Sequence, residues 1–217
     1  MATGQQLHKL TAADAAEQDY FGMSVAISGT TAIVGAHYDD DNGINSGSAY
    51  LFDTATGWQI AKLLPDDGAE DDWFGWSVAI SGTTAIVAAF FDDDNGTNSG
   101  SAYLFDTTTG RQIAKLLPDD GEELDYFGKF VAISGAAAIV GAYWDDDNGD
   151  KSGSAYLFDA SACPWDLNGD GAVGPFDLVL VLGFWGPNPG HPSDIDGDGE
   201  VGPFDLALVL GNWGPCP

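Results

Sequence analysis

The apolar residues of the first 160 positions follow a pattern that recurs every 53 residues. In the first copy, SVAISG alternates before a Ser-Gly turn, TAIVGA is a short β-branched run, and SAYLFD alternates again. A fourth stretch, GWQIAKLLPD, follows a Thr-Gly turn and stops at Pro65. Short alternating runs bounded by glycine turns are typical of half-buried strands. The pattern therefore predicts four short antiparallel strands in each copy.

Three copies of this unit are present, and their Phe-Gly pairs begin at Phe21, Phe74 and Phe127. Each copy continues through an acidic DDDNG stretch into SGSAYLFD. A period of this size indicates stacked supersecondary units, and four short strands with aromatics at fixed places are typical of a β-propeller blade. We expect a mainly β domain over residues 1–160, made of three four-stranded propeller-type blades. The three phenylalanines are expected in the core between blades.

The two ends of the repeat region differ from its middle. Residues 2–10, ATGQQLHKL, match ATGWQIAKL at 55–63 and are therefore predicted to form a fourth strand with no blade before it. The third copy has three strands, but FDASACPWD stands where its fourth would be. The N-terminal strand would complete that last blade and remove an exposed edge. Because propellers have about 4–8 blades, either two chains form a six-bladed homodimeric ring, or three blades are arranged unusually, or the chain is a fragment of a longer protein.

Residues 161–217 form a second predicted domain, small and α-helical, with two EF-hand-type calcium loops. The stretches DLNGDGAVGPFD and DIDGDGEVGPFD begin at Asp166 and Asp194. An EF-hand loop uses side chains at positions 1, 3 and 5, glycine at 6, a carbonyl at 7 and a carboxylate at 12, and calcium tolerates this variable oxygen shell better than magnesium does. The predicted ligands of two calcium ions are Asp166, Asn168, Asp170, Ala172, Asp177, Asp194, Asp196, Asp198, Glu200 and Asp205.

The segments that flank these loops indicate where the helices begin and end. Prolines before the second loop exclude an entering helix there, because proline interrupts a helix interior. Pro175 and Pro203 stand where a first helical residue tolerates proline, and Gly183 and Gly211 lie near the expected helix ends. Each loop is thus followed, not preceded, by a helix. The valine at position 8 of each loop is expected to join the two loops through a short β-bridge.

The blades resemble the FG-GAP repeat, the blade type of integrin alpha propellers and of many bacterial secreted proteins, over residues 5–159. The resemblance implies extracellular adhesion or scaffolding, and an Asp-rich calcium loop in each blade. Here the acids are consecutive, and neighbouring side chains of an extended chain point opposite ways, so at most two of three face one ion. Weak calcium ligands would be Asp39, Asp41, Asp92, Asp94, Asp145 and Asp147. The alternative is a solvated hairpin whose Asn-Gly supplies the turn.

The C-terminal region resembles a type I dockerin, because two calcium loops each lead into a DLxLVLGxWG helix. Its CPWD…GPCP frame is similar to dockerin-like tails of planctomycete secreted proteins. The resemblance implies docking onto a cohesin-type module through residues of the loop ends and helices. Apolar residues also run round most of each short helix, more than a two-helix module buries, which leaves a docking patch or a face for the blades or a second chain. The expected partner-binding residues are Pro175, Phe176, Val179, Pro203, Phe204 and Ala207.

The net charge of the chain limits the classes of partner that it can bind. The formal net charge is −28, which repels nucleic acid and anionic membranes and attracts cations. The longest apolar run, LVLVLGFW, is too short to span a bilayer, so no membrane insertion is expected. No signal peptide is visible, yet the resemblance favours an extracellular or cell-surface location. The two cysteines, Cys163 and Cys216, bracket the C-terminal region and form either a bridge across it or two free thiols.

No repeat carries a catalytic set. The histidines at 8, 37 and 191 do not recur between blades, and the serines lie in turns without a nucleophile elbow. We therefore expect a non-catalytic extracellular propeller attached through a calcium-dependent docking module. Two alternatives are the C-terminal part of a secreted polysaccharide-degrading hydrolase and a self-assembling structural protein.

Overall fold

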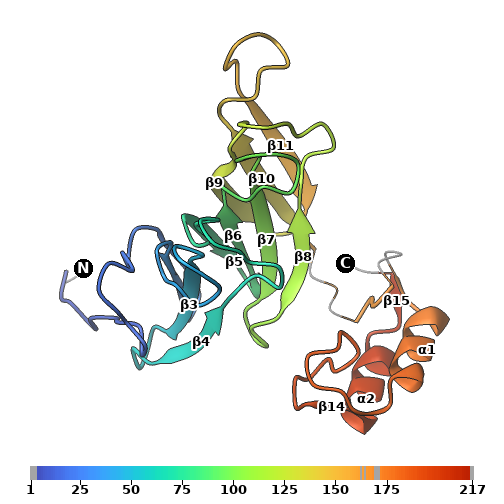
Figure 1. The fold of residues 1–217 in the computed structure, drawn as a ribbon. Coiled ribbons are helices and arrows are strands. Elements are labelled where there is room, and N and C mark those ends of the chain that lie inside the picture. The colour runs from blue at the N-terminus through green and yellow to red at the C-terminus, as the bar shows by residue number, and fades with distance from the viewer. Residues whose placement is uncertain (1–3, 162, 164, 169–171, 216–217) are drawn as a thin grey trace. The chain divides into compact units, whose positions relative to one another are not determined.

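The computed structural model describes residues 4–161, 163, 165–168 and 172–215. The chain divides into two compact units, Met1–Ala160 and Ser161–Pro217. Among the described residues, the first unit contains three antiparallel sheets and the second contains two short helices. Figure 1 shows these elements along the chain. No helix in the described ranges has the length and apolar character needed to cross a membrane.

Each sheet of the first unit comes from one 53-residue repeat, and strands that follow one another in sequence pair with each other. The first two sheets have four strands and the third has three in the described residues, so the predicted mainly β architecture of three repeats is confirmed. The strands are β1 (Val25–Ser28), β2 (Thr31–Ala36), β3 (Ser48–Asp53) and β4 (Gln59–Leu63); β5 (Ser77–Ser81), β6 (Thr84–Ala89), β7 (Ser101–Asp106) and β8 (Gln112–Leu116); and β9 (Phe127–Ser134), β10 (Ala137–Ala142) and β11 (Ser154–Asp159).

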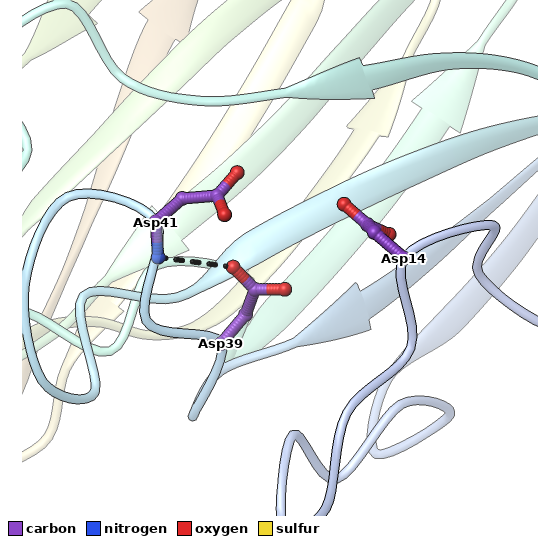
Figure 2. A group of neighbouring side chains, drawn as sticks. All are labelled: Asp14, Asp39 and Asp41. Atoms are coloured by element: carbon purple, nitrogen blue, oxygen red, sulfur yellow. Dashed lines mark hydrogen bonds between the residues drawn. The ribbon is translucent and has the colours of Figure 1, made fainter.

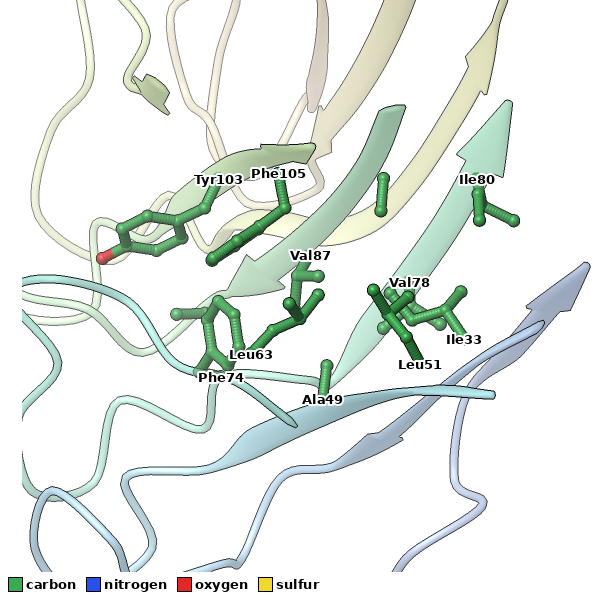
Figure 3. Packing of buried hydrophobic residues seen from close by; sticks show 12 residues of the cluster. Ile33, Ala49, Leu51, Leu63, Phe74, Val78, Ile80, Val87, Tyr103 and Phe105 are labelled. Atoms are coloured by element: carbon green, nitrogen blue, oxygen red, sulfur yellow. The ribbon is translucent and has the colours of Figure 1, made fainter. Parts of the chain in front are cut away.

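The hydrophobic core lies between blades rather than within them. One cluster joins Ile33 and Leu51 of the first blade to Phe74, Val87 and other residues of the second, as Figure 3 shows. A second cluster joins the second blade to the third in the same way and includes the fully buried Phe127. Phe74 and Phe127 thus lie between blades as expected, whereas Phe21 is half-buried and packs on the first blade's own cluster, because no blade precedes it in the described residues. Each blade is therefore stabilised by its neighbours, because one sheet alone cannot bury both of its faces.

Glycine is required where the backbones of neighbouring blades meet. Gly47 has φ +85, and a Cβ there would lie 2.0 Å from the carbonyl oxygen of Phe74. Gly100 has φ +86 and meets Phe127 in the same way. A side chain would both clash and strain the left-handed backbone. This close approach explains why a Ser-Gly pair precedes SAYLFD and why its partner is the Phe-Gly of the next repeat.

The second unit contains two copies of a loop and helix. Helix α1 spans Pro175–Gly183 and α2 spans Pro203–Gly211, each with proline in its first turn as predicted. Four two-residue strands accompany them: β12 (Ala172–Val173), β13 (Gly186–Pro187), β14 (Glu200–Val201) and β15 (Gly214–Pro215). A small core forms around Val173, Val181, Ile195, Val201 and Val209.

The expected bridge between the two loops is wrong. β12 of the first loop pairs with β15, which follows α2, and β14 of the second loop pairs with β13, which follows α1. Each loop valine therefore pairs with the segment that follows the helix of the other copy. Val173 lies opposite Gly214, and Val201 lies opposite Gly186. Both valines are still buried together in the unit's core. The two valines thus belong to one core cluster, while the backbone pairing goes to the segments after the helices.

Candidate functional site

The second loop of the C-terminal unit gathers three carboxylates. One oxygen each from Asp194, Asp196 and Asp198 lies within 4.8 Å of the others. Asp194 is 2% exposed, and its Oδ1 has no hydrogen-bond partner in the described structure. A buried carboxylate oxygen without a partner is costly. A hard cation that prefers oxygen ligands would satisfy it, so this donor set fits calcium.

The loop backbone holds these acids in place. The other oxygen of Asp194 accepts from the amide of Gly199 at 3.1 Å, where φ +92 reverses the chain. Asp196 and Asp198 each accept from the amide two residues onward. Burial raises the pKa of Asp196, and repulsion by neighbouring acids, Asp205 among them, adds to this effect. The loop therefore concentrates negative charge that a bound cation would neutralise.

The last acid of each loop has a second role. Asp205 is buried and accepts from the amides of Ile195 at 2.6 Å and Gly202 at 2.7 Å. It thereby joins the start of the loop to the start of α2. Asp177 does the same between Leu167 and α1. These two acids lie at the loop ends as predicted, and their oxygens are already shared with backbone amides.

The other predicted calcium positions fall into two groups. In the first loop, Asp166, Asn168 and Ala172 are described, but Asp170 lies outside the described residues. Glu200 of the second loop pairs with Pro187 through its backbone, and its side chain is exposed. The last acid of each loop, Asp177 or Asp205, thus makes the same backbone hydrogen bonds. Every residue of the second loop is described, but residues 169–171 of the first are not. Cys163 is disulfide-bonded, while Cys216 lies outside the described residues.

Both helices of this unit expose apolar side chains. Phe176 is 69% exposed and Phe204 is 73% exposed, at equivalent places in α1 and α2. The other expected partner-binding residues, Pro175, Val179, Pro203 and Ala207, are exposed as well. Leu182, Trp185, Leu210 and Trp213 add further exposed apolar surface.

The acidic loops of the first two blades surround a lysine. Lys62 Nζ lies 2.7 Å from Asp14, 3.1 Å from Asp39 and 2.6 Å from Asp41. Figure 2 shows the three carboxylates turned toward one another. Burial alone would lower the pKa of Lys62, but its hydrogen bonds to Asp14 and Asp41 outweigh burial and raise it. The ammonium group therefore stays charged and offsets part of the negative charge of the three carboxylates.

The second blade repeats this arrangement with Lys115 among Asp67, Asp92 and Asp94. Asp92 is also the acceptor for the hydroxyl groups of Ser101 and Tyr103, at 2.8 and 2.9 Å. Asp93, which lies between Asp92 and Asp94 in the sequence, instead accepts from the amide of Asn98. The expectation that only alternate acids face one position is thus confirmed. Sequence reasoning missed the lysines, although their 53-residue recurrence in a chain with only six Lys and Arg residues was a signal.

The third blade has the acids without the lysine. Asp145 is buried and accepts from the hydroxyl of Tyr156 at 2.6 Å. Repulsion by Asp145, together with burial and the nearby Asp120, raises the pKa of Asp147. The lysine of the other blades comes from their fourth strand, which is absent from the described third sheet. We call Asp120, Asp145 and Asp147 the third acidic cluster.

A row of six aromatic rings crosses the three blades, with each ring edge-on to the next. Ring centroids of successive members lie 4.4 to 5.6 Å apart. Edge-to-face packing of this kind stabilises beyond the area it buries. The members are Tyr20, Tyr38, Trp73, Phe91, Tyr126 and Trp144. Sequence analysis did not single them out as a row, although two aromatic positions recur in each repeat.

Comparison with family models matches three segments, residues 5–52, 58–105 and 111–158, to the FG-GAP repeat. The chain belongs to the FG-GAP repeat family. The second and third matched FG-GAP segments begin with β4 and β8, the strands that precede a blade, and all three segments end within the third strand of a blade. The C-terminal unit lies outside the FG-GAP match.

No curated protein matches this FG-GAP chain. One similar solved structure is the crystal structure of the computationally designed Ika4 protein, at 16% identity and a TM-score of 0.46, covering 72% of this chain and 74% of that one. Another is the hydrazine synthase of Kuenenia stuttgartiensis, at 19% identity and a TM-score of 0.43. That match covers 63% of the FG-GAP chain and 33% of the hydrazine synthase chain.

Proposed function

We propose that this protein is a non-catalytic extracellular binding or scaffolding protein, whose FG-GAP blades are attached to a cohesin-type partner through a calcium-dependent C-terminal unit. The family supports a binding role for the blades. The observation that carries the attachment is the buried, unpartnered Asp194 Oδ1 inside a group of three loop carboxylates. Calcium there would fix the loop from which α2 begins.

The exposed helix faces support docking. Phe176 and Phe204 stand at the first turns of α1 and α2, directly after the two loops. Aromatic side chains exposed in pairs are suited to serve as binding anchors, since aromatic residues dominate interface energies. Calcium in the loops and apolar residues on the helices would therefore act together, because the ion orders the segments that present the anchors.

The environments of the three histidines favour a non-catalytic role. His8 Nε2 lies 3.1 Å from the carbonyl oxygen of Ala55. Burial lowers the pKa of His37 to about 4, with a further contribution from Lys129. His191 lies against the ring of Phe184 in the other unit. The histidines thus occupy three separate structural settings.

The attachment is tested by calcium titration of the full chain with calorimetry and thermal unfolding. Wild-type protein should bind calcium, and EDTA should lower the unfolding temperature of the C-terminal unit, because the ion binds only the folded loop. Asp194→Asn should abolish binding at the second loop. Glu200→Gln is the matched control, since that residue would offer its backbone carbonyl, and it should bind as wild type does.

Docking is tested with the same proteins on immobilised cohesin modules. Phe176→Ser with Phe204→Ser should remove capture while calcium binding and the unfolding temperature stay unchanged. Calcium-independent unfolding together with capture by Asp194→Asn would refute the proposal.

A further inference from the structure

One edge of the third blade is open. β11 pairs with β10, and no strand of the described residues pairs with its other edge (Figure 1). In the first two blades that edge carries a fourth strand, which places Tyr50 opposite Lys62 and Tyr103 opposite Lys115. An open strand edge is a template for pairing with another chain. Tyr156 is the corresponding residue of β11.

The two ends of the blade array also expose complementary faces. Leu157 of the third blade is 76% exposed, whereas its counterpart Leu51 is fully buried against the second blade. On the first blade Val25 is 66% exposed, whereas its counterpart Val78 is 6% exposed. Each exposed face is thus one half of an interface that the chain forms twice internally.

The N-terminal segment, residues 4–10, is already held where a fourth strand would be needed. Leu10 packs on the core of the first blade, as Leu63 of β4 packs on the core of the second. His8 contacts the β3–β4 turn at Gly57, as Ala61 of β4 contacts the next turn at Gly110. The segment therefore lies against the first blade as β4 lies against the second. The outer side of this segment is exposed, and residues 4–10 form no strand.

Charge identifies what this segment fits. Lys9 stands 53 residues before Lys62, and it forms no ion pair within the described part of the chain. The third acidic cluster has the three acids that surround lysine in the other blades but has no lysine. A buried carboxylate such as Asp145 favours an opposite charge strongly, because few waters reach it.

We propose that the N-terminal segment of a second copy of this chain adds to β11 as its fourth strand and inserts Lys9 into the third acidic cluster. The register follows from the complete blades: Leu10 lies opposite Ala155, Lys9 opposite Tyr156, and His8 opposite Leu157. The face of the second copy's first blade that carries Val25 then covers Leu157.

A further hydrogen bond supports the same register. The side-chain oxygen of Gln59 accepts from the amide of Ala13 at 2.9 Å, and that of Gln112 accepts from Asp66 at 3.1 Å. The next members of this series are Gln6 as acceptor and Asp119 as donor, 53 residues from the known pairs. The N-terminal segment thus carries both of the polar side chains that the third blade lacks.

The contact joins different surfaces of the two copies, so it repeats until a ring closes or a filament grows. Two copies that exchange their N-terminal segments contain six blades, within the range of about 4–8 that closed propellers have. The expected assembly is therefore a dimer in which both open edges are covered.

Light scattering of the full chain tests the assembly, in EDTA so that a calcium-dependent contact of the C-terminal unit does not contribute. The mass should be twice the 22.6 kDa of one chain. Lys9→Glu should weaken the dimer at least about 100-fold, because it replaces a buried ion pair by repulsion. Leu7→Ser is the matched control: its counterpart Ile60 stays 50% exposed in a complete blade, so the dimer should persist. A monomeric wild type, or a Lys9→Glu variant that dimerises normally, would overturn the proposal.

A cysteine trap tests the register without depending on dimer affinity. One chain carries His8→Cys and a separate chain carries Leu157→Cys. After mixing and mild oxidation, the two chains should become linked to each other, as seen on a non-reducing gel. Leu7→Cys mixed with Leu157→Cys should not link, because position 7 faces the other side of the strand. Equal linking by positions 7 and 8, or linking by neither, would contradict the proposed strand addition.

Discussion

Removal of Lys115 tests whether the blade acids depend on an internal cation. Lys115→Met keeps most of the side chain's apolar length but removes the charge that contacts Asp67, Asp92 and Asp94. Asp67 and Asp94 are about half exposed, and each pair should contribute about 0–1 kcal/mol. Asp92 is buried, and loss of a buried partner costs about 3–5 kcal/mol.

Two neutral donors reduce that cost. Asp92 keeps the hydroxyl groups of Ser101 and Tyr103, so we expect a net loss of about 3 kcal/mol. For a unit of this size the unfolding temperature should fall by about 6–12 °C. The assay is scanning calorimetry in EDTA, which separates the unit containing the blades from the C-terminal unit.

Lys151→Met is the matched control, since the exposed Lys151 lies over the half-buried Trp144 ring and should contribute about 1 kcal/mol or less. Lys62→Met should behave like Lys115→Met, because its contacts are the same. Millimolar calcium should recover part of the stability lost by either variant and none in wild type. A loss for Lys115→Met no larger than that of the control would refute the argument that the lysine neutralises a buried acid.

Two further perturbations concern burial and backbone shape. Burial raises the pKa of Asp72 to about 6, so the folded protein holds a proton that the unfolded chain releases near pH 4, and stability falls as pH rises between these values. Asp72→Asn should remove that fall, so the variant should be more stable than wild type by about 3 kcal/mol at pH 8 but not at pH 4. Urea unfolding at the two pH values measures this difference. Equal stabilities of variant and wild type at both pH values would contradict the prediction. Gly100→Ala should cost about 3 kcal/mol or more, because its Cβ would lie 2.0 Å from the Phe127 oxygen. Gly82→Ala, at φ +59 with nothing nearby, should cost about 1 kcal/mol, and equal losses for the two would refute the close-approach argument.

The strands of the blades were predictable because their pattern is local. Each alternating run lies between glycine turns, and each helix of the C-terminal unit begins at a proline, so short windows of sequence suffice. The pairing of β12 with β15 was not predictable in this way. It joins Val173 to a residue 41 positions later, Gly214, and depends on how two helices bring the chain back.

The lysine sites show a similar limit. Asp39 and Lys62 are 23 residues apart, on a loop and on a strand that meet only because β3 pairs with β4 in a fixed register. The sequence predicted that alternate acids would share one position, and that geometry was right. It did not predict that the chain itself supplies the cation, because this requires knowing which face of β4 carries the ammonium group.

Because each core cluster between blades joins one blade only to the next, the array has a uniform step rather than a single centre. A segment of 53 residues inserted between blades would recreate every contact that it interrupts, including a glycine approach, a lysine among acids and two more members of the aromatic row. An insertion between blades that is not a whole number of repeats would break these contacts together. Duplication or loss of whole repeats is therefore the change in length that this architecture tolerates best, and the number of blades is a property that can vary while every interface stays the same.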